Sequence, residues 1–179
     1  MTRKQRTEEE LKAALKHLIY EIEMLKGTMK HLEAEKDNKG VIYYALIESF
    51  AVHARALMHF LYPAGQIKEG DVIAKDFFRS TECLPLDCLN EPEGCFEARQ
   101  RVNKEIAHLT YDRQLVASEE KKWFYNKLGN EILAIFYSFL RTLPPHLYDK
   151  SYHIPTKMRN DTTLVASTSA IESRFISCL

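Results

Sequence analysis

Residues 11–32 read LKAALKHLIYEIEMLKGTMKHL, and this stretch decides the fold class. Its apolar residues recur at alternating intervals of four and three, which places them along one side of an α-helix. Thr7 followed by Glu10 is typical of a helix start, and residues 37–40 (Asp-Asn-Lys-Gly) are typical of a turn. The pattern therefore predicts one long helix over residues 8–36. The residues of this heptad seam are Leu11, Leu15, Leu18, Ile22, Leu25, Met29 and Leu32.

Three further helices follow from apolar periodicity and from helix-breaking residues. Residues 41–62 are apolar almost all round and are followed by Pro63, so they predict the central helix of the fold. A third helix is expected to begin at Asn90, which precedes an early proline and can cap the helix. A fourth is expected over residues 118–142, before Pro144. The core stripe expected on the third helix is Cys95, Ala98, Val102, Ile106 and Leu109.

These elements predict an all-α protein, an antiparallel four-helix bundle with a long loop between its second and third helices. No strand pairs or internal repeats appear in the sequence. A short helix is expected within that loop, over residues 71–78. The bundle domain is predicted to occupy residues 1–145. Periodicity is lost from residue 146 onward, which predicts a flexible, disordered C-terminal tail over residues 146–179.

Composition narrows the functional classes. The 25 Lys and Arg residues balance 25 Asp and Glu residues, which argues against a broad nucleic-acid surface but leaves room for a small local basic site. The four cysteines have no common metal-binding spacing, so a reduced, cytoplasmic protein is expected. The N-terminus has no signal-peptide pattern. Because there is no run of about 18 apolar residues, no membrane association is expected.

One candidate site is the stretch RVNKEIAH, residues 101–108. Arg101 and His108 are seven residues apart, which is two helical turns, so they share one face of the third helix. That face lies at the margin of the expected bundle, and Glu105 falls between the pair and the core stripe. The pair is either a functional site that faces a neighbouring helix or subunit, or a solvated helix face.

The second helix carries a narrow polar stripe, in which Glu48, Val52, Arg55 and His59 follow at intervals of four, three and four. A stripe this narrow suits a crevice or a subunit contact, whereas a surface helix normally has a wide polar face. The alternative is a row of ion pairs within the helix, in which neighbouring residues bridge Glu48 and Arg55. His53 lies off the stripe among apolar residues and is expected to be a core histidine with a polar partner.

The helical architecture and the Arg101–His108 motif resemble the HEPN superfamily (higher eukaryotes and prokaryotes nucleotide-binding), in which an arginine and a histidine on a late helix are separated by four to six residues. Val102 departs from the polar residue that often follows the arginine in this family, and Asn103 is the nearest polar residue. The resemblance implies RNA cleavage without a metal or other cofactor, at a site built by two protomers. His108 would transfer protons, and Arg101 would bind the phosphate. Members that bind without cleaving imply an RNA- or nucleotide-binding module instead.

Two other hypotheses remain open. The first is a non-catalytic adaptor bundle that pairs with a protein partner through the seam of the first helix. That seam is longer than the second helix, so an overhanging part would need cover, which predicts a homodimer. The second is a metal site: Glu105 and His108 form a Glu-x-x-His pair, as in di-iron bundles, and Glu48 would add a ligand. The remaining ligands of such a site are missing from the sequence.

Overall fold

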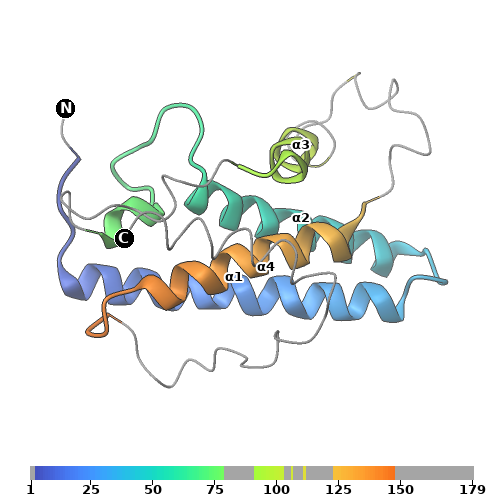
Figure 1. The fold of residues 1–179 in the computed structure, drawn as a ribbon. Coiled ribbons are helices and arrows are strands. Elements are labelled where there is room, and N and C mark those ends of the chain that lie inside the picture. The colour runs from blue at the N-terminus through green and yellow to red at the C-terminus, as the bar shows by residue number, and fades with distance from the viewer. Residues whose placement is uncertain (1–2, 79–90, 103–105, 107–110, 112–122, 148–179) are drawn as a thin grey trace. The chain divides into compact units, whose positions relative to one another are not determined.

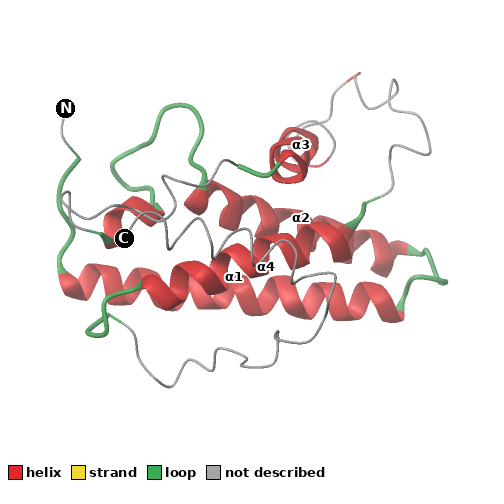
Figure 2. Cartoon of the chain, in the orientation of Figure 1, coloured by secondary structure: helices red, strands yellow, loops and turns green. Residues whose placement is uncertain are grey.

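The computed structural model describes residues 3–78, 91–102, 106, 111 and 123–147 of the 179-residue chain. These residues form four α-helices and one short 3₁₀-helix, and no strand occurs among them (Figures 1 and 2). The prediction of an all-α helical bundle is confirmed. The helices are α1 (Glu8–Ala34), α2 (Val41–Leu61), η1 (Ala74–Phe77), α3 (Glu93–Arg101) and α4 (Tyr125–Thr142).

Some helix starts agree with the predictions from local sequence and others do not. The predicted cap of α1 is confirmed: the Thr7 backbone N–H donates to Glu10 Oε2 at 2.8 Å, and the Glu10 N–H donates to Thr7 Oγ1 at 3.2 Å. The predicted start of the fourth helix at residue 118 is wrong, because Trp123 and Phe124 are not helical and α4 begins at Tyr125. The short helix expected over residues 71–78 is present as η1. Of the predicted tail, only His146 and Leu147 are described, and Leu147 is buried.

The chain packs into two compact units. The described residues of the first unit belong to ranges 3–17, 60–78 and 133–147, and those of the second to ranges 18–59, 91–111 and 123–132. Each unit is therefore assembled from segments that are distant in sequence.

An aromatic cluster forms the core of the first unit. The Phe60 ring lies 5.0 Å from Phe139, 5.3 Å from Phe136 and 5.8 Å from Phe77, measured between ring centroids. Phe77 also meets Phe139 edge-on at 5.5 Å. Such edge-to-face pairs add about 0.5–1.5 kcal/mol each beyond the burial of apolar area. All four rings are buried, so this cluster joins the end of α2, η1 and α4 into one core.

Arg3 links the N-terminal segment to η1 and to the loop before it. Its Nε donates to Asp76 Oδ1 at 2.7 Å, and a second guanidinium nitrogen donates to Asp76 Oδ2 at 3.0 Å. The same side chain donates to the carbonyl oxygens of Lys68, at 2.8 Å, and Asp71. The hydrogen bond to the Asp76 carboxylate raises the pKa of Arg3. A bidentate arginine–carboxylate pair of this kind fixes geometry as well as charge.

In the second unit, α1 turns its heptad seam inward. Leu18, Ile22, Leu25, Met29 and Leu32 are all buried. Met29 lies so close to Gly129 on α4 that a Cβ built on the glycine would overlap the methionine sulfur. Because the chain's own core occupies the seam, a protein partner would have to use another surface. In the first unit, Leu15 of the same seam is buried and Leu11 is half-buried. The homodimer itself stays a prediction.

One side of α2 is exposed, so the prediction of a central helix, made from its apolar composition, is wrong for this side. The exposed fraction is 84% for Val41, 65% for Ile42 and 54% for Val52. Within the described part of the chain, α2 is the one helix long and apolar enough to cross a membrane. Length and composition alone are weak evidence for a span, since core helices of soluble proteins meet the same criterion.

Candidate functional site

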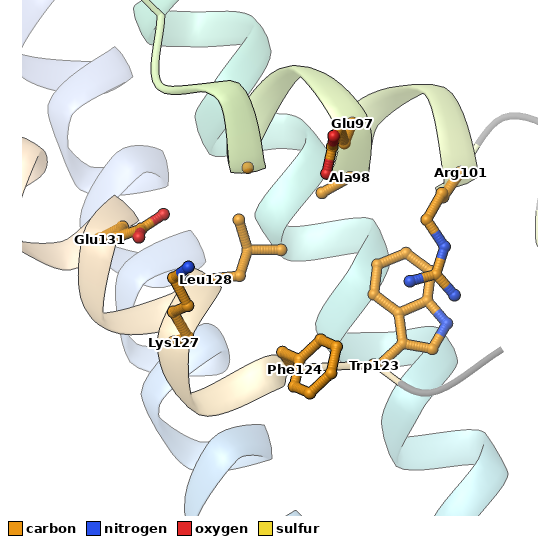
Figure 3. Close-up of a pocket in the computed structure, with 9 residues that line it drawn as sticks. Glu97, Ala98, Arg101, Trp123, Phe124, Lys127, Leu128 and Glu131 are labelled. Atoms are coloured by element: carbon orange, nitrogen blue, oxygen red, sulfur yellow. The ribbon is translucent and has the colours of Figure 1, made fainter. Parts of the chain in front are cut away.

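A pocket of about 130 Å³ opens between α3 and the start of α4 in the second unit (Figure 3). The short α3 contributes one side of the pocket. The other side comes from Trp123 and Phe124, which precede α4, and from the first two turns of that helix. The lining residues are Gly94, Glu97, Ala98, Arg101, Trp123, Phe124, Lys127, Leu128 and Glu131.

Arg101 and Trp123 form the most specific contact in this pocket. The guanidinium carbon of Arg101 lies 4.3 Å from the centroid of the indole ring, and Figure 3 shows the two groups stacked at one end of the pocket. A cation over an aromatic face is attracted by the quadrupole of the ring, by roughly 0.5–2 kcal/mol. An arginine stacks on an aromatic ring through the face of its guanidinium, which is distinct from the in-plane N–H groups that bind phosphate.

The rest of the pocket combines charged and aromatic groups. Lys127 and Glu97 are exposed, and Phe124 is 72% exposed. Figure 3 shows Lys127 and Glu131 at the end of the pocket opposite Arg101. Gly94 leaves room for the Glu131 carboxylate, since a Cβ at that position would lie 3.3 Å from Oε2. Two cations and two carboxylates therefore surround an aromatic surface, with no net formal charge.

The buried side of α3 offers no nucleophile. Cys95 is fully buried, and burial, with the nearby Glu131 and Glu91 carboxylates, raises its pKa to about 12. The thiol therefore stays neutral and unreactive at physiological pH. Arg99 donates to Glu91 Oε2 at 2.8 Å. Burial raises the pKa of Glu91 despite this pairing, so the ion pair supports α3 and is not a source of reactive charge.

The structure places only part of the predicted site. Arg101 lies at the pocket, whereas Asn103, Glu105 and His108 lie outside the described residues. Glu48 and Arg55 are exposed on α2 and His59 is half-buried, and none of the three lines the pocket. The alternative of an ion-pair row on α2 is not observed, since neither Glu48 nor Arg55 makes an ion pair within the described structure. His53 does have a polar partner, Glu21 Oε2 at 2.7 Å from its Nδ1, as expected.

Sequence reasoning missed Trp123, Phe124 and Lys127. The run Trp-Phe-Tyr at residues 123–125 suggests core and rim packing, which holds for the buried Tyr125 but not for the exposed Phe124. The sequence offers no local signal for this grouping, because Trp123 and Phe124 precede α4 and the pocket forms only where α3 packs beside them.

A metal centre finds no support in the described ranges, where no group of three His, Cys, Asp or Glu residues is placed to hold an ion. The proposed ligands Glu105 and His108 fall outside those ranges, so that hypothesis stays untested. Comparison with family models, curated proteins and solved structures finds no match to this chain.

Proposed function

We propose that the protein binds single-stranded RNA, with one nucleotide seated in the α3–α4 pocket. The observation that carries the proposal is the Arg101 guanidinium stacked at 4.3 Å on the only tryptophan of the chain, beside the exposed Phe124 and Lys127. Aromatic faces and arginine planes stack with unpaired bases, and arginine and lysine bind phosphate.

The mixed charge of the pocket favours a nucleotide over a simple anion. Arg101 and Lys127 supply cations for a phosphate, while Glu97 and Glu131 supply acceptors for the amino groups of a base. At about 130 Å³ the pocket is smaller than the roughly 300–1,000 Å³ of small-molecule sites, so it fits one planar group better than a whole cofactor. A double helix presents its bases stacked and paired, and a concave pocket of this size does not reach them.

RNA cleavage is the further step that the HEPN resemblance implies. In that mechanism Arg101 stabilises the charge that develops on the phosphate, and His108 transfers the proton of the attacking 2′-hydroxyl. The first role draws on the planar guanidinium of Arg101, because its forked N–H groups match the geometry of phosphate oxygens. The role of His108 rests on the resemblance alone.

Binding is tested with fluorescently labelled single-stranded RNA of mixed sequence, followed by anisotropy. Loss of stacking or of a phosphate contact is expected to weaken binding by about 1–3 kcal/mol in Arg101→Ala and Phe124→Ala, and by less in Lys127→Ala. Arg141→Ala and Lys30→Ala are matched controls, because both residues are exposed and neither lines the pocket. Equal affinity in all five variants, or a wild type that binds no RNA, would reject the proposal.

Cleavage is tested on the same RNA with and without EDTA. The HEPN mechanism predicts products that persist in chelator and disappear in both Arg101→Ala and His108→Ala, while circular dichroism shows that each variant remains folded. Activity that chelator abolishes would favour the Glu105–His108 metal site. Binding without any cleavage would leave a non-catalytic RNA-binding module.

A further inference from the structure

The exposed side of α2 carries a heptad pattern of its own. Its positions follow at intervals of four, three, four, three and four, which places them along one side of the helix. The α2 seam contains three apolar residues, two charged residues and one histidine, and all but the half-buried His59 are exposed. The α2 seam consists of Val41, Ala45, Glu48, Val52, Arg55 and His59.

We infer that a second copy of this chain docks on the α2 seam, with the two helices antiparallel. Glu48 and Arg55 are seven residues apart, or about 10.5 Å along the helix axis. If a two-fold axis crosses α2 midway between them, Glu48 of each copy lies level with Arg55 of the other. The seam is therefore complementary to itself in charge, as a surface shared by two identical subunits must be.

The apolar residues of the seam suit the same arrangement. Val52 lies beside the expected axis, and Ala45 and Ala56 flank it on the exposed side of the helix. Small side chains at these positions allow two helix backbones to approach closely. Within the described structure neither Glu48 nor Arg55 has an ion-pair partner, so docking would give both charges a partner and would not break an existing pair.

This charge pattern favours a protein copy over a lipid surface. Insertion of α2 into a bilayer would bring both Glu48 and Arg55 into hydrocarbon, where charged side chains are strongly unfavourable. A helix that lies on an anionic membrane has an excess of lysine and arginine on its polar face. The α2 seam has one arginine and one glutamate.

The test is a charge swap followed by sedimentation equilibrium of the full chain at concentrations up to about 100 µM, a range that covers micromolar dissociation constants. Glu48→Arg and Arg55→Glu each set like charges against each other, and each is expected to raise the dimer dissociation constant roughly tenfold or more. The double variant Glu48→Arg/Arg55→Glu restores both pairs, and its dissociation constant should return to within about threefold of the wild type. Glu23→Arg, at an exposed position of α1, is the matched control and should leave the dimer intact.

Three results would overturn the inference. They are a wild type that stays monomeric, single variants that dimerise as the wild type does, and a double variant that fails to recover. Co-sedimentation of the wild type with phosphatidylserine vesicles, abolished by Val52→Asp, would identify a membrane as the occupant and would also overturn it. The α2 seam shares no residue with the α3–α4 pocket, so loss of the dimer and loss of RNA binding are separate results.

Discussion

Two groups of aromatic side chains in this protein have opposite surroundings. In the first unit, Phe60, Phe77, Phe136 and Phe139 contact one another and are buried. In the second unit, Trp123 lies against a cation and Phe124 faces solvent. Rings that pack on rings stabilise the fold, whereas an exposed ring beside cations adds little stability and is available to a ligand. The same residue type therefore has a structural role in one unit and a proposed binding role in the other.

Phenylalanine-to-alanine substitutions should separate these roles most strongly. Phe139→Ala removes a ring that is fully buried and contacts Phe60, Phe77, Phe78 and Phe136, so the free energy of unfolding should fall by about 3–5 kcal/mol. Phe124→Ala should change it by less than about 0.5 kcal/mol. Urea denaturation at neutral pH measures both values, and similar losses in the two variants would erase the contrast.

Arg3 stabilises the first unit by polar contacts, in addition to the aromatic contacts of its core. Arg3→Ala removes both bonds to Asp76 and the bonds to two carbonyl oxygens. We expect a loss of about 1.5–3 kcal/mol, since the contacts are charge-assisted and partly buried. Arg3→Lys keeps the positive charge but cannot make the two-bond contact of a guanidinium with a carboxylate, so it should recover less than half of the lost stability. Lys4→Ala, at the exposed neighbouring position, is the control. A loss no larger than that of the control would show that the contacts contribute little.

Gly129 and Gly27 give a matched pair within the second unit. A Cβ at Gly129 would meet Met29, whereas nothing lies within 4 Å of a Cβ at Gly27. Gly129→Ala should therefore destabilise the protein by about 1–2 kcal/mol through overpacking. Gly27→Ala should stabilise it by about 0.5–1 kcal/mol through helix propensity. Thermal unfolding with both variants tests this, and stabilisation by Gly129→Ala would mean that the Met29 side chain moves aside freely.

The smallest expected effect concerns pH. Lys36, with Asn126 and the Tyr125 hydroxyl, donates to Glu33 and lowers its pKa. A lowered carboxyl pKa in the folded state contributes stability above the unfolded pKa, and that contribution is lost as pH falls through the folded pKa. Glu33→Gln should therefore reduce stability at about pH 7 and have little effect at about pH 3. Urea midpoints at both pH values test it, and a loss of equal size at the two would contradict the assignment.

Local patterns in the sequence were sufficient for part of this fold. The Thr7–Glu10 cap and the heptad seam of α1 depend on residues three and four apart, so they can be found without knowledge of the rest of the chain. The sequence does not reveal that α4 begins only at Tyr125, because the non-helical conformation of Trp123 and Phe124 depends on tertiary packing. The Arg3–Asp76 pair joins residues 73 positions apart and leaves no local signal.

The candidate site divides in the same way. Arg101 could be predicted because it belongs to a motif. In the sequence alone, Trp123 and Phe124 cannot be distinguished from core aromatic residues. The apolar composition of α2 could not show which side of the helix the core would cover. Burial of Ile47, Phe50, Ala54 and Leu57, with exposure of Val41 and Val52, depends on packing between elements. Composition indicates how apolar a helix is, whereas only the tertiary structure shows which side of the helix is buried and which is exposed.

The fluorescence of Trp123 is the most direct test of RNA binding in the α3–α4 pocket. Trp123 is the only tryptophan of the chain and stacks on Arg101 in the pocket, so its intrinsic emission reports on that site alone. Titration with unlabelled single-stranded RNA should quench the emission to saturation, a duplex of the same sequence should have little effect, and Arg101→Ala should require more RNA to reach the same quenching. Unchanged Trp123 emission at RNA concentrations where anisotropy shows saturated binding would place the RNA elsewhere and contradict the account.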